Sequence, residues 1–217
     1  MPPKITKQDP AEKRIKRIIT ILTQEYEPVC ALHFETPFQL LIATILSAQC
    51  TDERVNQVTP VLFEQYPTPA DLAEAPLEEI ETIIRSTGFY RNKAKSVKAV
   101  SEAVANRFDN RLPEDMDALT ELPGIGRKTA NVVLGTAFGH PAIMVDTHVK
   151  RLSNRLGLTS QSNPDKIERD LVELVPAKER TAFSHRLIWH GRHVCTAKKP
   201  NCPACKLAAL CPSEGTV

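Results

Sequence analysis

A lysine just beyond a glycine turn is the residue of this chain best suited to covalent chemistry. In the string LPGIGRKTANVV, Lys128 follows Gly124 and Gly126. Glycine allows a positive φ and lets the backbone come close to another molecule. The amides of such a turn, and of the helix after it, can point together at an anion, where the helix dipole favours negative charge. One reading of the pattern is a phosphate site with Lys128 beside it as a nucleophile. The other is an αα-hairpin that needs glycine only to turn, followed by a solvated lysine in the first turn of a helix.

Asp146 is the carboxylate expected to work with this lysine. It follows Lys128 by 18 positions, at the end of the extended segment PAIMVD and directly before THVKRL. The residues between them suffice for one helix and a return, so the two side chains could face one cleft. Asp146 also suits the N-cap position of the helix THVKRL, a role it can fill at the same time.

The reaction that suits this pair is attack by an amine on C1′ of a deoxyribose. The attack displaces the base and leaves a Schiff base on the lysine, which a water nucleophile would not form. Burial, the helix N-terminus and Arg127 would all favour the neutral amine of Lys128 that the attack needs. A carboxylate against the amine would oppose this, so Asp146 better suits stabilising positive charge on the sugar or relaying a proton.

Four of the six cysteines lie in the last 23 residues and form a second chemical centre. They are Cys195, Cys202, Cys205 and Cys211, with six, two and five residues between them. A short loop of little apolar content needs something stronger than packing to organise four thiolates. Thiolate ligation permits either a zinc ion or a [4Fe-4S] cluster, and in a reducing compartment both are favoured over disulfides.

The elements that must position these residues are predicted to be helices, because apolar residues recur at helical spacing and no sustained period-2 run occurs. The fold class is therefore all-α. The stretch 37–49 is apolar almost all round, which is typical of a central buried helix. Thr51 is expected to cap the next helix, with Val55, Val58, Val61 and Leu62 on its inner face and Pro60 either kinking it or falling in its first turns. The other predicted helices cover residues 11–28, 76–86, 91–108, 114–122, 127–138, 147–158, 164–175 and 179–194.

Charge is divided unevenly along the chain. Residues 1–121 carry 14 Lys and Arg against 19 Asp and Glu, whereas residues 122–217 carry 14 against 7. A polyanion-binding second half fits this asymmetry, and so do solvated helix faces. The sequence shows no secretory segment and no apolar run approaching the roughly 20 residues that span a bilayer. We therefore expect no membrane association and a cytoplasmic address in or near the nucleoid. We also expect the protein to be a monomer.

The strings LPGIGRKTANVVL and VDTH closely resemble the endonuclease III branch of the helix-hairpin-helix DNA glycosylases. The resemblance extends from PFQLLIATILSAQCTD through GFYRNKA to the terminal cysteines. It implies a bifunctional DNA glycosylase and AP lyase that excises oxidised pyrimidines from damaged double-stranded DNA through a Schiff base on Lys128, assisted by Asp146, and cleaves the strand by β-elimination. The six-two-five cysteine spacing is that of this branch, which implies a [4Fe-4S] cluster rather than zinc.

The same resemblance assigns DNA contacts and pocket residues. It points to Gln49 as the plug for the gap that an extruded base leaves, and to Phe89 as a wedge between base steps. Phe89 stands where leucine is usual, and Cys50 where a small residue is common. The alternatives are that Gln49 is simply a polar residue at a helix end and that Phe89 is an aromatic ring in the core.

The remaining assignments are less specific. DNA contacts are also expected from Gly124, Gly126, Arg127, Lys198 and Lys199, and polar groups of the pocket are expected from Ser47, Asp52 and His148. Lys198, Lys199 and Arg192 would offset the negative charge of the cluster. The alternatives are that Lys198 and Lys199 are solvated surface lysines and that His148 is a core histidine whose hydrogen bonds are made within the protein.

The resemblance also implies two helical lobes. Residues 1–29 with 141–217 would form the cluster-bearing domain, and residues 30–140 a six-helix barrel that contains the hairpin. An adenine-mispair glycosylase of the same superfamily is the alternative enzyme, although it usually lacks the lysine of RKTANVV and carries a further C-terminal domain. A non-enzymatic helix-hairpin-helix DNA-binding module and an iron-sulfur electron carrier are alternatives from other classes.

Overall fold

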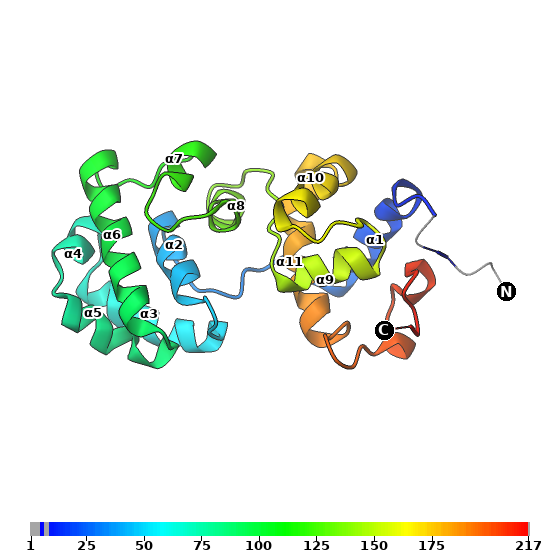
Figure 1. Ribbon diagram of the computed structural model, residues 1–217, viewed down its shortest axis with the longest axis horizontal. Helices are drawn as coiled ribbons and strands as arrows, with labels where there is room; N and C mark the ends of the chain where they lie inside the picture. The colour runs from blue at the N-terminus through cyan, green and yellow to red at the C-terminus, as the bar shows by residue number, and fades with distance from the viewer. Residues whose placement is uncertain (1–4, 7–8, 217) are drawn as a thin grey trace. The chain divides into compact units, whose positions relative to one another are not determined.

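The structure is a computed structural model that describes residues 5–6 and 9–216 of the 217-residue chain. The described residues form helices and connecting loops without a strand, which confirms the all-α prediction (Figure 1). The α-helices are α1 (Glu12–Glu25), α2 (Pro37–Leu46), α3 (Asp52–Gln65), α4 (Pro69–Glu74), α5 (Leu77–Ile84), α6 (Tyr90–Phe108), α7 (Met116–Thr120), α8 (Arg127–Thr136), α9 (Thr147–Arg155), α10 (Pro164–Leu174) and α11 (Arg180–His193). Four 3-10 turns are η1 (Arg85–Thr87), η2 (Ala177–Glu179), η3 (Cys202–Ala204) and η4 (Ala208–Leu210).

The helix starts follow from local chemistry. The Thr36 side chain accepts from the Gln39 amide at the start of α2, and Thr51 accepts from the Arg54 amide at the start of α3, as its sequence predicts. Each cap satisfies an amide that has no partner inside its helix. Proline occupies a first-turn position of α2, α4 and α10, where its missing N–H is not needed.

Helix α3 departs from the expected inner face. Pro60 lies well inside the helix rather than in its first turns, and Val61 is 45% exposed. The buried stripe of α3 consists of Val55, Val58, Thr59 and Leu62. At 100° per residue, Val61 falls outside this stripe and Thr59 falls within it, so placing Val61 on the inner face was wrong.

The described chain divides into two compact units, one of residues 30–139 and one of residues 1–29 with 140–217. In the first unit, α2 supplies the centre of the core, and Leu40, Leu41 and Ile42 are wholly buried. Helices α3, α6 and α8 pack against α2, and α6 also packs against α4 and α5. This packing holds the end of α2, the turn before α6 and the start of α8 in fixed positions within the unit.

The second unit joins the start of the chain to its end. Ile18 and Leu22 of α1 are buried in one core with Phe183 and Leu187 of α11. The buried guanidinium of Arg14 donates from Nη1 to the carbonyl oxygens of residues 156 and 210, at 2.8 Å each. Figure 1 shows α1, in blue, beside α11 and the C-terminal segment, in orange and red. The cysteine segment is therefore packed on a helix from the opposite end of the sequence.

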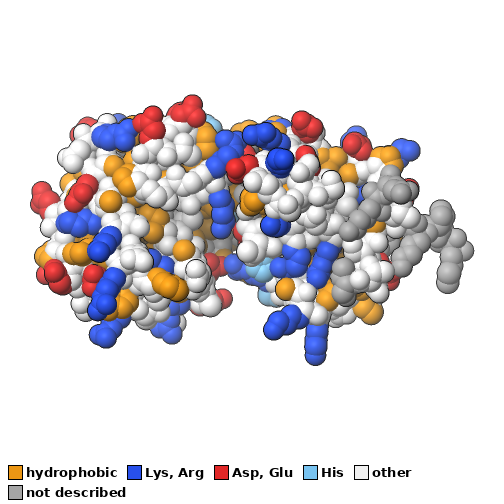
Figure 2. Space-filling model, in the orientation of Figure 1, with side chains coloured by type: hydrophobic (Ala, Val, Ile, Leu, Met, Phe, Trp, Pro, Cys, Tyr) orange, Lys and Arg blue, Asp and Glu red, His pale blue; other side chains and the backbone are white. Residues whose placement is uncertain are grey.

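Formal charge differs between the units. Residues 30–139 hold 10 Lys and Arg against 15 Asp and Glu, and the rest of the chain holds 18 against 11. Figure 2 shows both kinds of charged side chain on the visible face of each unit. In the part of the chain that the structure describes, no helix has the length and apolar character that crossing a membrane requires.

Candidate active site and cysteine centre

The glycine turn lies between α7 and α8. The Ile125 amide donates to the Leu122 carbonyl at 3.1 Å, and Gly124 has a φ of 74°. Gly126 is the N-cap of α8 with a φ of −92°, so only one of the two glycines uses the left-handed region. A Cβ at Gly126 would meet nothing within 4 Å, so packing inside the protein does not require glycine there. The space beside Gly126 is open to a ligand.

The start of α8 can receive an anion. No side chain caps it, and no acidic residue lies in its first turn. Lys128 is the second residue of the helix and is exposed, as is Arg127. The expected burial of Lys128 is absent in the DNA-free protein, because the lysine stands on the outer side of a first turn. Removal of water from this amine must therefore come from a bound partner.

Asp146 is the N-cap of α9. Its Oδ1 accepts a hydrogen bond from the Val149 amide at 2.7 Å, which confirms the predicted capping role, and the residue is half-buried. Asp146 belongs to the unit of residues 1–29 and 140–217, whereas Lys128 belongs to the other unit. Their joint action at one sugar therefore stays a prediction.

His148 is fixed by Arg151. Nη2 of Arg151 lies 3.1 Å from Nδ1 of His148. Burial lowers the pKa of His148, while the Asp146 carboxylate opposes that shift. The same Nη2 also donates to the carbonyl oxygens of Gly191 and Cys195, both at 2.9 Å. His148 is thus a hydrogen-bonded, half-buried neighbour of Asp146.

Gly191 is a part of this arrangement that sequence reasoning missed. A Cβ at Gly191 would lie 2.9 Å from Nδ1 of His148 and 3.0 Å from Nη2 of Arg151. The close approach of α9 to α11 therefore requires glycine. The sequence did hold a signal, because a glycine inside a helical pattern weakens the helix unless packing needs it.

Gln49, Phe89 and Gly124 line one cavity of about 350 Å³ in the unit of residues 30–139. Gln49 and Phe89 both have left-handed backbones, with φ of 52° and 48°, although neither is glycine. Phe89 is 64% exposed, so the alternative of a core aromatic ring is wrong. Strained, exposed residues at a cavity make this surface a candidate functional site. The other lining residues are Thr44, Ile45, Ala48, Asn92, Lys93, Ser96, Pro123 and Thr129.

Ser47 and Asp52 lie near this cavity in sequence but do not line it. Ser47 caps the end of α2, and its hydroxyl donates to the Thr44 carbonyl at 2.8 Å. Asp52 is the first residue of α3 and is half-buried. Their predicted roles in a base pocket stay predictions.

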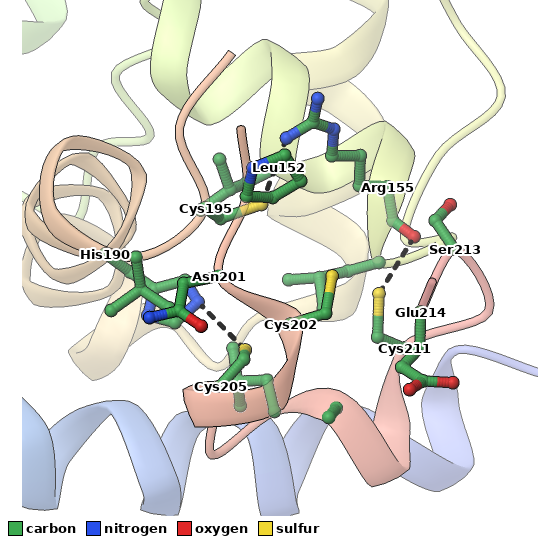
Figure 3. Close-up of a pocket in the computed structure, with 15 residues that line it drawn as sticks. Leu152, Arg155, His190, Cys195, Asn201, Cys202, Cys205, Cys211, Ser213 and Glu214 are labelled. Atoms are coloured by element: carbon green, nitrogen blue, oxygen red, sulfur yellow. Dashed lines mark hydrogen bonds between the residues drawn. The ribbon is translucent and has the colours of Figure 1, made fainter. Parts of the chain in front are cut away.

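The four C-terminal cysteines line one pocket between α9, α11 and the terminal segment (Figure 3). They form no disulfide with one another. Burial raises the pKa of the Cys205 and Cys211 thiols, and the neighbouring cysteines add to this effect. Four thiols in one apolar pocket therefore need a positive centre to hold them as thiolates.

Polar side chains are aimed at the sulfur atoms. Arg155 Nη1 donates to Cys195 Sγ at 3.3 Å. Nε2 of the buried His190 lies 3.4 Å from Cys205 Sγ, and its Nδ1 lies 3.0 Å from Tyr26 Oη. Figure 3 shows Arg155 and His190 approaching the pocket from different elements. Sequence reasoning missed Arg155, His190 and Tyr26. Arg155 and Tyr26 lie far from the cysteine segment in the sequence, so spacing alone does not connect them with it.

Three arginines that were not predicted make contacts around this pocket, and the predicted roles of Lys198, Lys199 and Arg192 stay predictions. Lys198 and Lys199 are exposed on the loop after Cys195. The guanidiniums of Arg155 and Arg151 reach the Cys195 sulfur and carbonyl, and that of Arg14 donates to the carbonyl of Leu210, next to Cys211. Among the described residues, no three His, Cys, Asp or Glu side chains are grouped so as to hold one metal ion.

Comparisons with known proteins identify the family. Residues 42–177 match the family of HhH-GPD superfamily base excision DNA repair proteins. Endonuclease III of Synechocystis sp. (strain ATCC 27184 / PCC 6803 / Kazusa) is 53% identical over 204 residues, covering 93% of each chain. Endonuclease III of Bacillus subtilis (strain 168) is 46% identical over 183 residues, covering 84% of each.

A solved structure shows the same fold. It is a trapped endonuclease III–DNA covalent intermediate in an estranged-adenine complex, with a TM-score of 0.88, 44% identity, and coverage of 92% of this chain and 95% of that one. The chain therefore belongs to the HhH-GPD superfamily of base excision DNA repair proteins, within the endonuclease III family, and is a DNA glycosylase with AP lyase activity.

Proposed function

We propose that this enzyme excises oxidised pyrimidines from duplex DNA and cleaves the strand through a Schiff base on Lys128. The observation that carries the proposal is the exposed Lys128 in the first turn of α8, directly after a glycine hairpin whose helix start no side chain caps. A phosphate bound at these amides would place the adjoining sugar beside Nζ. The relative trapped as a covalent intermediate with DNA supports a nucleophile of this kind.

The chemistry balances with these two residues. Neutral Nζ of Lys128 attacks C1′, and the N-glycosidic bond breaks with its electron pair passing to the base, which takes up a proton. The Asp146 carboxylate stabilises the positive charge that develops on the sugar and relays the proton. Nζ then loses a proton and the C1′–O4′ bond breaks, with O4′ taking up a proton, so that the opened sugar is held as an iminium. Removal of a C2′ proton expels the 3′ phosphate, and water later hydrolyses the imine to release the lysine.

DNA binding completes the site. An extruded nucleotide costs a few kcal/mol to unstack, so the protein must fill the gap in the duplex. Gln49 and Phe89 are exposed at one cavity with Gly124, and in this proposal they enter the gap while the hairpin holds the backbone. Closure of the DNA over Lys128 would remove the water that surrounds its side chain in the DNA-free protein.

We also propose that Cys195, Cys202, Cys205 and Cys211 hold a [4Fe-4S] cluster. When bound, the cluster would cross-link the terminal segment through its four thiolate ligands. The donor set fits, because four thiols line one pocket and guanidiniums approach it.

Borohydride trapping on a duplex that contains an oxidised pyrimidine tests the catalytic proposal. Lys128→Ala should lose the covalent adduct and reduce strand cleavage by roughly 10³-fold or more, while DNA binding persists. Lys166→Ala is the matched control, because Lys166 is also an exposed lysine in a helix's first turn. An adduct that survives in Lys128→Ala would disprove the assignment. Visible absorbance of protein purified without air tests the cluster.

A further inference from the structure

We infer that Arg85 and Arg91, both held on the ring of Tyr90, form a phosphate clamp for the DNA backbone beside Phe89. The inference rests on the proposed DNA repair function and adds a binding subsite to it. The three residues Arg85, Tyr90 and Arg91 are called the arginine clamp below. Its ligand is the phosphodiester backbone of duplex DNA.

The geometry of the clamp leaves its hydrogen-bond donors facing outward. The Cζ atom of Arg91 lies 5.5 Å from the centroid of the Tyr90 ring, and that of Arg85 lies 6.0 Å from it. Both arginines are exposed, and Tyr90 is half-buried. A guanidinium over a ring is attracted through its face, so its N–H groups remain available at the edge. Those edges match the two oxygens of a phosphate.

The clamp arginines keep their charge within an acidic unit. Residues 30–139 have five more acidic than basic side chains, and three glutamates lie on α5 just before Arg85. Even so, the described residues show no ion pair for Arg85 or Arg91. Glu79, one of these glutamates, instead accepts a hydrogen bond from Tyr66 at 2.5 Å. Two unpaired cations in an acidic unit provide local attraction for a polyanion.

Arg107, which lies on α6 with Arg91, shows the contrast. Its Cζ lies 5.3 Å from the centroid of Phe108, so it has the same kind of ring contact. Unlike the clamp arginines, Arg107 forms an ion pair with Glu121 at 2.6 Å. Ring stacking alone therefore does not distinguish the clamp. The distinction is that Arg85 and Arg91 stack without an acidic partner.

The turn between the two arginines is held by buried hydrogen bonds. Lys93 is 5% exposed, and its Nζ donates to the Thr87 carbonyl at 2.8 Å. The Thr87 hydroxyl in turn donates to the Ile84 carbonyl at 2.8 Å. Burial lowers the pKa of Lys93, and the nearby Cys50 opposes this shift. This hydrogen-bonded turn orders the clamp before DNA arrives, which reduces the entropy that binding would otherwise lose.

Phe89 lies between the clamp arginines in the sequence. It is 64% exposed and holds a left-handed backbone at the end of that hydrogen-bonded turn. No side chain caps the start of α6, and no acidic residue lies in its first turn. When Phe89 enters a base step, the clamp would hold phosphates on the backbone next to that step. These contacts would offset part of the energy of unstacking.

The salt dependence of DNA binding tests the clamp. The probe is a duplex with a stable tetrahydrofuran abasic-site analogue, and Kd is measured over a range of NaCl concentrations. Each phosphate contact contributes about 0.9 to the slope of log K against log salt. Arg85→Gln and Arg91→Gln should each lower the slope by about that amount, whereas Arg107→Gln should not. Arg85→Lys should restore most of the slope, and circular dichroism checks that each variant is folded.

The outcomes separate the clamp from the catalytic proposal. An unchanged slope in both Arg85→Gln and Arg91→Gln overturns the clamp, while borohydride trapping by the same variants keeps the Lys128 assignment in place. An equal fall in Arg107→Gln also overturns it, because general charge would then account for the effect. If the parent protein neither binds the duplex nor forms an adduct with a cleavable one, the proposed function itself fails.

Discussion

At the scale of residues, both candidate catalytic groups stand at the starts of helices. Lys128 lies in the first turn of α8, and Asp146 caps α9 through its Oδ1. Side chains at these positions are held by backbone geometry rather than by burial. The Cα of Lys128 is fixed by a helix that packs on α2, and its exposed side chain extends from that fixed point.

His185, on α11, gives a residue-scale prediction. It is 7% exposed, and burial lowers its pKa to about 4, against the opposing effect of Asp146. An unfolded chain takes up this proton near pH 6.5, so between pH 6.5 and 4 the unfolded state binds more protons. The free energy of unfolding should therefore fall as pH drops through this window, by about 3 kcal/mol from His185 alone.

Denaturant unfolding at several pH values measures this effect. His185→Gln should lose less stability than the parent between pH 6.5 and 4, because it carries no imidazole to protonate. His33→Gln is the control, since His33 is exposed. A parallel pH profile for the parent and His185→Gln would contradict the prediction.

At the scale of elements, the hairpin between α7 and α8 shows two glycines with different tasks. Gly124 needs its missing side chain for a φ of 74°, whereas Gly126 has an ordinary φ and open space around it. Glycine at position 124 is therefore required by the backbone of the fold. Glycine at position 126 is not, and the open space beside it suits a ligand that approaches the backbone closely.

Substitutions should separate these two tasks. Gly124→Ala should destabilise the protein by about 1–2 kcal/mol, because alanine is strained at positive φ. Gly126→Ser should leave the melting temperature unchanged or slightly higher, since serine is a good N-cap, but should weaken DNA binding. The serine side chain would fill the space beside residue 126 and accept hydrogen bonds from the amides that a phosphate needs. Unaltered DNA affinity in a folded Gly126→Ser protein would argue against an anion site there.

At the scale of the whole molecule, each unit has its own core. The unit of residues 1–29 and 140–217 packs α1, α9, α10 and α11 around one cluster of apolar side chains, with Cys195, Cys205 and Cys211 at its edge. The other unit is built around α2. The cysteine centre should therefore support only the unit that contains it.

Hydrogen exchange tests this separation. Cys205→Ser, which removes one proposed cluster ligand, should lose visible absorbance together with amide protection in α1, α9 and α11. Protection in α2 and α6 should stay close to that of the parent. Equal loss of protection in both units would show that they unfold as one cooperative body.

The sequence by itself was enough for most of the helices, for the hairpin and for the grouping of the four cysteines, whereas the short helix α4 (Pro69–Glu74) was not predicted. Helical periodicity, an N-cap threonine at Thr51 and glycines at a turn act over a few residues, so they can be read locally. Asp146 was predicted to cap its helix on the same grounds, and the structure confirms it. The fold class followed from these local signals, and family resemblance supplied the chemistry.

Tertiary structure decided which side chains face water and which cations meet the cysteines. Phe89 proved exposed and Val61 lay outside its helix's buried stripe, because burial depends on what packs from elsewhere in the chain. Arg14 reaches the carbonyl beside Cys211 from a helix 196 residues earlier than Leu210. Local periodicity cannot encode a contact across such a separation, since only the packed core brings its two ends together.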